Sequence, residues 1–223
     1  MKISIIIPVL DEERRIGELL EGLRGFEDVI VVDGGSRDGT VEVARAFPGV
    51  RVGSAPRGRA LQMNHGAWRA RGDVLLFLHA DVVLPPDAVL HVERALADER
   101  AVAGAFRTWH VSDDGRSAPW LHLADLRSRY SGLPYGDQAL FVRREAFWRA
   151  GGFPEQPLME DLELSRRLRR LGRISIAPAS VRVSGRRFLA HPVRHALLVN
   201  SFPVLYRLGV APATLARLYQ DVR

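Results

Sequence analysis

Short apolar segments alternate with amphipathic ones over the first third of the chain, and this alternation constrains the fold most. Apolar runs of strand length lie at residues 3–8, 29–33, 50–54 and 74–79. Between them, stretches with helical periodicity lie at residues 12–24, 39–47 and 59–71. This order predicts a mostly parallel sheet with helices on both faces. Ligands of such sheets bind beyond the carboxyl ends of the strands, so we expect the functional residues there.

The pattern becomes less regular after Pro85 and Pro86, which start a helix that reaches about Leu96. Further strands are expected at 102–109, 139–143 and 174–183, and further helices at 120–130 and 160–171. Two more helices are expected in the tail, separated by residues 209–212. Because no stretch has the composition of a flexible linker, we expect a single domain over 1–223, divided into a first half (1–98), a mixed second half (99–190) and a helical tail (191–223).

The composition permits a large core without covalent staples. Of the 223 residues 47% are hydrophobic and 26% are charged, and a folded chain of this length buries roughly 70% of its surface. The absence of cysteine excludes a disulfide scaffold, a thiolate metal site and a cysteine nucleophile, and it fits a reducing, cytoplasmic compartment. We expect no secretory signal, because the N-terminal apolar run stops at Pro8.

The formal net charge of +6 suggests an anionic partner. Lys2 is the only lysine, and the arginines are spread over several expected helices, which is more typical of solvated faces than of a nucleic-acid groove. We therefore expect no nucleic acid, and favour an anionic small ligand or an anionic membrane surface, since arginine binds phosphate through two parallel hydrogen bonds.

Polar clusters follow each of the four early strands. They lie at residues 11–13, 33–40, 57–59 and 79–81. A carboxylate such as Asp33, at the end of an apolar strand, is costly to bury unless it accepts hydrogen bonds from a ligand or a turn. Asp38 directly precedes a helix, where a capping role is the simpler interpretation.

Four of these motifs together resemble family 2 glycosyltransferases of the GT-A fold. They are IIPVLDEE at 6–13, VDGGSRDGT at 32–40, the acidic motif at Asp81, and MEDLEL at 159–164. Their order and intervals cover nearly the whole chain. YGDQALF at 135–141 and SGRRF at 184–188 further resemble the small members of this family that are associated with radical-SAM proteins and with selenium- or arsenosugar-related genes.

The resemblance implies a Rossmann-like, mostly parallel sheet flanked by helices, with a nucleotide-binding half, a smaller acceptor-side half and C-terminal helices. It also implies inverting transfer of a hexose from a UDP- or GDP-sugar, with Mg²⁺ or Mn²⁺ bound by the last acid of a D-x-D motif. The matching triplet here is His79-Ala80-Asp81, so Asp81 is the expected metal ligand. His79 replaces the first aspartate and is expected to contact the ribose or to pack, because Mg²⁺ prefers oxygen ligands.

The positions that match the family's donor site are Pro8, Asp11, Glu12, Asp33, Gly35, Arg59, Gln62, His79, Asp137, Gln138, Arg186 and Arg187. Pro8, Asp11 or Glu12, and Asp33 would hold the base and the ribose, and the glycines after Asp33 would allow close backbone approach. Arg59 and Gln62 lie at a helix start that suits an anion.

Asp161 matches the general base that inverting transfer needs, and Glu160 beside it would orient or contact the acceptor. Two adjacent carboxyl groups shift each other's pKa. Asp137 and Gln138 would lie where donor sugar and acceptor meet, and Arg186 with Arg187 would close over the diphosphate. The simpler alternative for Glu160 and Asp161 is stabilisation of a helix N-terminus.

Two other functions stay open. A nucleotide-sugar or nucleic-acid binding module without activity is consistent with His79 in place of aspartate. A nucleotidyltransferase is disfavoured, because it typically has a glycine-rich basic loop after its first strand and residues 8–12 contain none. The acceptor is a small molecule or a lipid-linked one. The apolar run of the tail, at 196–206, is too short to span a bilayer. We expect the tail to pack on its own domain; the alternatives are contact with the inner membrane surface or with a second subunit in a homodimer.

Overall fold

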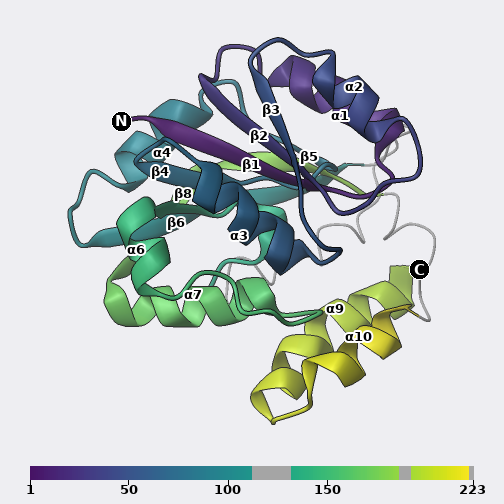
Figure 1. Ribbon diagram of the computed structural model, residues 1–223. Helices are drawn as coiled ribbons and strands as arrows, with labels where there is room; N and C mark the ends of the chain where they lie inside the picture. The colour runs from purple at the N-terminus through teal and green to yellow at the C-terminus, as the bar shows by residue number, and fades with distance from the viewer. Residues whose placement is uncertain (112–131, 186–191, 221–223) are drawn as a thin grey trace.

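A computed structural model of the chain describes residues 1–111, 132–185 and 192–220, and its centre is an eight-stranded sheet (Figure 1). The strands are β1 (Ile3–Val9), β2 (Asp28–Asp33), β3 (Val50–Ser54), β4 (Val74–Phe77), β5 (Val82–Val83), β6 (Ala101–Val111), β7 (Phe141–Arg143) and β8 (Arg173–Ser184). The helices are α1 (Glu13–Gly22), α2 (Thr40–Arg45), α3 (Arg59–Arg69), α4 (Ala88–Ala95), the 3-10 turn η2 (Gly136–Gln138), α6 (Arg144–Arg149), α7 (Glu160–Leu171), α9 (Pro192–Arg207) and α10 (Pro212–Gln220). The helix expected at 120–130 lies outside the described residues.

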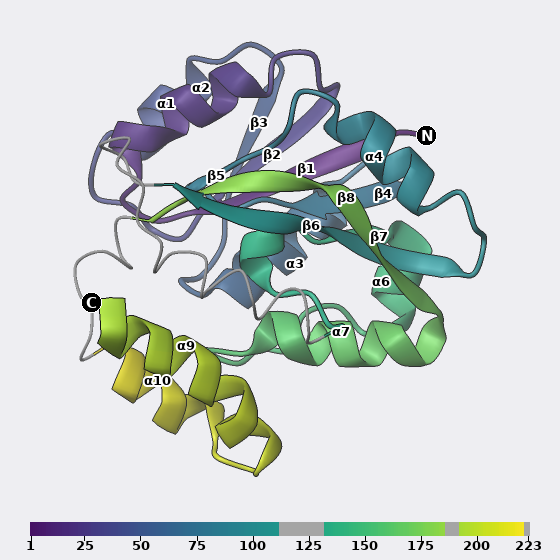
Figure 2. The same cartoon turned by 180° about the vertical axis from the view of Figure 1, so that it is seen from behind.

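The helices cover both faces of the sheet, as the alternation predicted. One buried cluster joins β1 and β2 to α1, α2 and α4, and a second joins them to α3, α6 and α7 (Figures 1 and 2). Along β1, Ile5 and Ile7 belong to the first cluster and Ile6 to the second, and all three are fully buried. Burial on both faces explains why this strand has a continuous apolar run instead of an alternating one.

The strand order is β3-β2-β1-β4-β7-β6-β8-β5. The first four strands pair in parallel, and β6 pairs with β8 in parallel, whereas β7 is antiparallel to both of its neighbours and β5 is antiparallel to β8. The α/β expectation is therefore confirmed, with a second half that is mixed. The strand β5 and the helix α6 were not predicted. β5 has only two residues, which is too short for a readable periodicity, and α6 directly follows β7 without a turn signal between them.

Gly66 on α3 allows this helix to approach the sheet closely. A Cβ atom at this position would lie 2.4 Å from Ile6 Cγ2 and 3.2 Å from Val32 Cγ2. We expect Gly66→Ala to lower the free energy of unfolding by about 1–3 kcal/mol, although alanine favours helix formation, because the core there is already filled. Urea denaturation measures the effect. Gly22→Ala on α1 is the control, since no atom lies within 4 Å of its Cβ position; equal stability of the two variants would contradict this account.

The tail helices α9 and α10 form a hairpin that extends away from the sheet, on the same side as α7 (Figures 1 and 2). Phe202 and Leu215 of the hairpin pack with Leu158, Met159 and Leu162 in a third buried cluster. The tail therefore packs on its own domain. No helix in the described parts of the chain is both long enough and apolar enough to cross a membrane.

Candidate functional site

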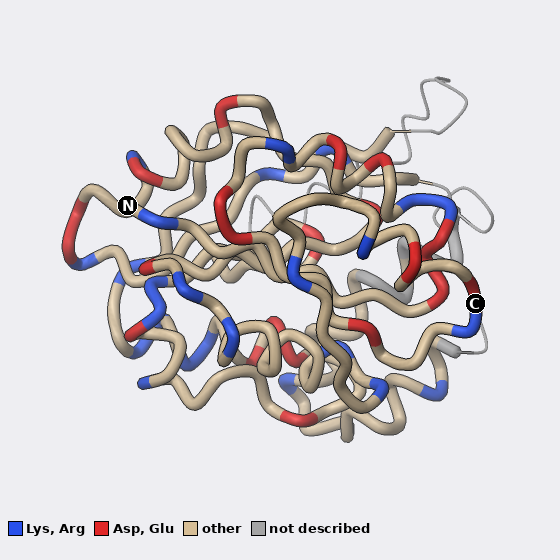
Figure 3. Tube along the Cα trace, turned by 45° about the horizontal axis from the view of Figure 1, so that its top comes forward, with Lys and Arg blue, Asp and Glu red and all other residues tan. Residues whose placement is uncertain are grey.

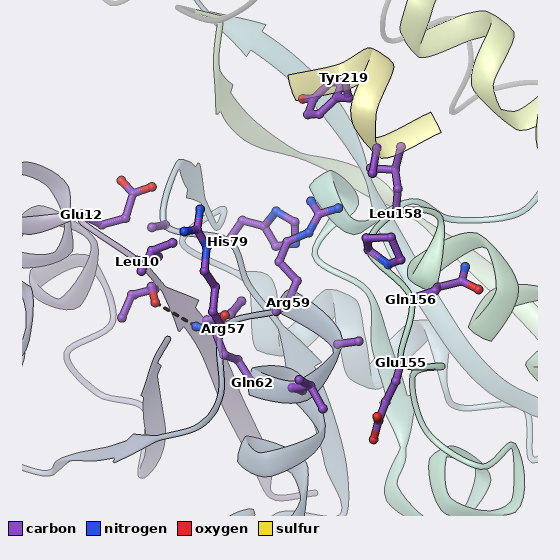
Figure 4. Close-up of a pocket in the computed structure, with 18 of the residues that line it drawn as sticks. Leu10, Glu12, Arg57, Arg59, Gln62, His79, Glu155, Gln156, Leu158 and Tyr219 are labelled. Atoms are coloured by element: carbon purple, nitrogen blue, oxygen red, sulfur yellow. Dashed lines mark hydrogen bonds between the residues drawn. The ribbon is translucent and has the colours of Figure 1, made fainter. Parts of the chain in front are cut away.

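A cavity of about 610 Å³ lies beyond the carboxyl ends of β1 and β4. This volume is typical of sites for small molecules and cofactors. Its wall consists of Pro8 and Val9 at the end of β1, Leu10 and Glu12 after it, residues 57–62 at the start of α3, residues 79–81 after β4, residues 155–158, and Ala216 with Tyr219 on α10. Figure 4 shows these segments, distant in the sequence, around one space. The cavity is thus located at the sheet edge where strand-end chemistry was expected.

Five of the predicted donor-site residues and the predicted metal ligand line this cavity. They are Pro8, Glu12, Arg59, Gln62, His79 and the predicted metal ligand Asp81. Asp11, Asp33, Gly35, Asp137, Gln138 and the predicted catalytic residues Glu160 and Asp161 are not among the lining residues. Arg186 and Arg187 lie outside the described residues.

The carboxylates of Asp33 and Asp11 organise the loops that follow β1 and β2. Asp33 is 7% exposed and accepts hydrogen bonds from the backbone N–H of Gly35 at 2.9 Å, the backbone N–H of Ser36 at 3.1 Å and the Ser36 hydroxyl at 2.5 Å. Asp11 Oδ1 accepts from the Arg37 backbone N–H at 2.8 Å. Each carboxylate keeps acceptor capacity, so the predicted contacts with the nucleoside stay predictions.

Gln62 joins the ends of two strands. Its Nε2 donates to the carbonyl oxygens of Val9 and Val32, each at 2.8 Å, and Figure 4 shows one of these bonds as a dashed line. Gln138, which is 1% exposed, similarly donates from Nε2 to the Phe106 carbonyl and accepts at Oε1 from the Tyr135 N–H, each at 2.9 Å. Both side chains therefore have a structural role, and the expectation that they also contact the donor stays a prediction.

We expect Gln62→Leu to lower the free energy of unfolding by about 1–3 kcal/mol, because two strand-end carbonyls lose a buried donor. Chemical denaturation measures this change. Gln156→Leu is the matched control: Gln156 lines the same cavity, and its Nε2 has no hydrogen-bond partner among the described residues, so its loss should have little effect. A Gln62 variant as stable as the control would contradict the strand-joining role.

A buried ion pair forms one wall of the site. Arg59 Nε lies 2.8 Å from Glu160 Oε1, and the Glu160 side chain is only 2% exposed. Burial raises the pKa of Glu160 and the adjacent Asp161 charge adds to this, while Arg59 opposes it. Burial disfavours the Arg59 charge, but Glu160, Asp161 and Asp81 outweigh that cost and raise the Arg59 pKa. The guanidinium therefore stays charged at the edge of the cavity.

Asp161 lies in the first turn of α7. This helix begins directly after Met159, whose backbone has a φ of 65°. Asp161 Oδ2 accepts from the Gly136 backbone N–H at 2.5 Å, and Asp161 Oδ1 accepts from the Leu162 N–H at 2.7 Å. A Cβ atom on Gly136 would lie 3.2 Å from Asp161 Oδ2 and 3.0 Å from the His79 ring. Asp161 and His79 therefore meet across Gly136.

Burial lowers the pKa of His79 and the Arg59 charge adds to this, although Asp81, Asp137 and Asp161 act in the opposite direction. The imidazole is therefore neutral at pH 7. It adds no positive charge to the site, and its position among these acids places it at the junction between the cavity and Asp161.

The cavity wall contains three acids, Glu12, Asp81 and Glu155. The described part of the chain contains no cluster of three histidine, aspartate or glutamate side chains that could hold a metal ion by themselves. Mg²⁺ is typically bound by one or two carboxylates together with substrate phosphates and water, so Asp81 fits a hard divalent cation that arrives with a diphosphate.

Sequence reasoning missed two kinds of lining residue. Arg57 belongs to a strand-end cluster and could have been selected by its charge. Tyr219 and the segment 155–158 could not, because they reach the cavity only through the way the tail and the approach to α7 pack on the sheet.

Residues 4–151 match the family model described as glycosyl transferase family 2. The chain belongs to this family. The undecaprenyl-phosphate 4-deoxy-4-formamido-L-arabinose transferase of Pseudomonas aeruginosa (strain LESB58) is 33% identical over an alignment of 159 residues, and the match covers 63% of this chain and 46% of that protein. The glucosyl-3-phosphoglycerate synthase of Mycolicibacterium paratuberculosis is 33% identical over 99 residues, 37% of this chain and 29% of that protein. The chain thus spans half or less of the length of these curated relatives.

Solved structures confirm the expected GT-A fold for this family 2 chain. TarS of S. aureus in complex with UDP-GlcNAc superposes with a TM-score of 0.66 at 21% identity, covering 82% of this chain and 58% of that one. The mannosyltransferase PcManGT of Pyrobaculum calidifontis in complex with GDP-Man and Mn²⁺ gives 0.64 at 21% identity, covering 99% and 69%. The expectation of a family 2, GT-A chain is therefore confirmed.

Proposed function

We propose that this family 2 protein transfers a hexose from a UDP- or GDP-sugar to an acceptor hydroxyl, with inversion at the anomeric carbon. The observation that carries the proposal is that the Arg59 cation and the Asp81 carboxylate line one cavity together with His79, whose ring lies beside the oriented Asp161 carboxylate behind the cavity wall. Family membership supports it.

The donor would lie with its nucleoside near Pro8, Leu10 and Glu12 and its diphosphate near Arg59 and Asp81. Negative charge grows on the diphosphate as the glycosidic bond breaks, and a fixed guanidinium stabilises it. Asp81 would hold Mg²⁺ or Mn²⁺, which supplies further positive charge to the phosphate oxygens when bound. The Mn²⁺ in the complexes of PcManGT and of the Mycobacterium tuberculosis glucosyl-3-phosphoglycerate synthase supports this assignment.

Asp161 would act as the general base. The acceptor oxygen attacks the anomeric carbon, its proton passes to an Asp161 oxygen, and the bond from the anomeric carbon to the diphosphate oxygen breaks, releasing the nucleoside diphosphate. The Gly136 and Leu162 N–H groups fix the carboxylate orientation before the acceptor arrives. Glu160, held by Arg59, would position the start of α7.

The acceptor in this proposal is a small or lipid-linked molecule. The relatives named undecaprenyl-phosphate transferases and glucosyl-3-phosphoglycerate synthase support these two classes, one a lipid phosphate and the other a small phosphorylated acid. A lipid phosphate would attack through an ionised phosphate oxygen, so the role of Asp161 as base applies to an acceptor hydroxyl.

The test measures nucleotide release and product mass. UDP-glucose, UDP-GlcNAc or GDP-mannose is incubated with Mn²⁺ and with undecaprenyl phosphate or 3-phosphoglycerate, and NMR of the product gives the anomeric configuration. We expect one donor to yield a glycoside of inverted configuration. Donor binding without nucleotide release above that of Asp161→Asn would instead support a binding module without activity, for which His79 in place of aspartate is the observation.

A further inference from the structure

An apolar stripe on the outer face of α9 has no cover in the described structure. Leu197, Val204 and Leu208 are 67%, 53% and 77% exposed. Their spacing of seven and four residues places them on one face of the helix. The opposite face packs inward through Phe202 and Leu205. A helix with apolar residues on two faces is more stable when both faces are buried. We therefore expect a second apolar surface to cover the stripe.

The hairpin that carries this stripe has a net positive charge. Residues 192–220 contain three arginines and neither aspartate nor glutamate. Arg207 and Arg217 are exposed on the hairpin, next in sequence to the exposed Leu208 and Leu218. In the first half of the chain both basic and acidic residues occur along the trace (Figure 3), whereas the hairpin has basic residues alone.

We propose that the α9–α10 hairpin docks on an anionic lipid membrane, with the leucines and Val204 in the interface and the arginines on lipid phosphates. The absence of Asp and Glu from the hairpin favours an anionic membrane over a second copy of the chain. In a symmetric contact between two copies the stripe would face its own image, and Arg207 of each copy would oppose like charge without a carboxylate from the hairpin to pair with it. An anionic membrane satisfies the apolar and the charged groups together.

The hairpin also connects this surface to the site. Ala216 and Tyr219 on α10 line the cavity, while Leu218 of the same helix is 46% exposed. Docking would therefore bring a wall of the cavity close to the lipid surface. This consequence rests on the proposed function, and it favours the lipid-linked class of acceptor over the small one.

Co-sedimentation with vesicles tests the docking without any substrate. We expect the wild type to bind vesicles of phosphatidylcholine with phosphatidylglycerol, to bind pure phosphatidylcholine at least about fivefold more weakly, and to lose affinity as salt rises. Leu208→Glu and Val204→Glu should each weaken binding by about tenfold or more, because a carboxylate replaces an inserted apolar group. Leu90→Glu on α4, where the leucine is 42% exposed and Glu93 lies on the same helix, is the matched control.

Wild-type protein that fails to bind the anionic vesicles, or hairpin variants that bind as well as Leu90→Glu, would overturn the proposal. Analytical sedimentation of the protein without vesicles tests whether a second copy covers the stripe. A dimer that Leu208→Glu dissociates would show that the stripe is a dimer interface. Asp161→Asn is expected to bind vesicles as the wild type does. Failure of transfer activity with retained vesicle binding would therefore count against the proposed function alone.

Discussion

Replacing Asp161 by Asn is expected to lower kcat by about 10²- to 10⁴-fold, the contribution typical of a general base. Asparagine has the same shape and can accept one of the two N–H groups that Asp161 binds, that of Gly136 or that of Leu162, but it cannot take a proton from the acceptor. Because the substitution leaves the diphosphate contacts in place, the donor Kd should stay within a few-fold of the wild-type value. Steady-state kinetics and donor titration measure the two quantities separately.

Asp87→Asn is the matched control for this variant, since Asp87 is 57% exposed and its partner is His91 on α4. We expect wild-type kcat for it. An Asp161→Asn enzyme that keeps half of the wild-type kcat would remove Asp161 from the role of base, and with it the inverting mechanism as written.

Arg59→Met is expected to lower the free energy of unfolding at pH 7 by about 2 kcal/mol. Loss of the partner of a buried ion costs about 3–5 kcal/mol, and the smaller value applies because Arg59 itself is 40% exposed and therefore screened. The variant should also bind nucleoside diphosphates more weakly, since the cavity loses its fixed cation. Thermal or urea unfolding gives the first quantity and calorimetry the second.

The pH dependence of this effect follows from Glu160. Burial already raises its pKa in the wild type, and removal of Arg59 takes away the group that opposes this rise. A carboxyl group whose pKa is raised on folding destabilises the fold when it is ionised and not when it is protonated. The loss of unfolding free energy in Arg59→Met, relative to the wild type, should therefore be largest at neutral pH and shrink as the pH falls toward the ordinary pKa range of glutamate. Adding Glu160→Gln to Arg59→Met should recover most of the loss at pH 7. A deficit that is the same with and without Glu160→Gln would show that the ion pair is not its cause.

The sequence predicted most of the sheet because burial on both faces leaves a clear signal. The limits of β3 and α7 agree with the expected 50–54 and 160–171, since each lies between strong turn signals. The location of the cavity followed from the same alternation, because the ends of parallel strands meet at one edge.

The individual site residues were less predictable, because hydrogen-bond partners depend on tertiary contacts. Gln62 and Gln138 have the residue type of ligand contacts, yet their amides bind backbone carbonyls. Tyr219 lines the cavity only because Phe202 and Leu215 dock the hairpin against the start of α7. Motif matching selects the positions close to the site, whereas packing decides which of them face the cavity.

Calorimetric titration of UDP and of GDP into the wild type and into Asp81→Ala, each with and without Mn²⁺, tests the central claim most directly. The account predicts that one nucleotide binds with an affinity that Mn²⁺ raises by about tenfold or more, and that Asp81→Ala abolishes this increase. Binding that is indifferent to Mn²⁺ and to Asp81, or no binding of either nucleotide, would contradict the assignment of this cavity to a metal-bound nucleotide-sugar donor.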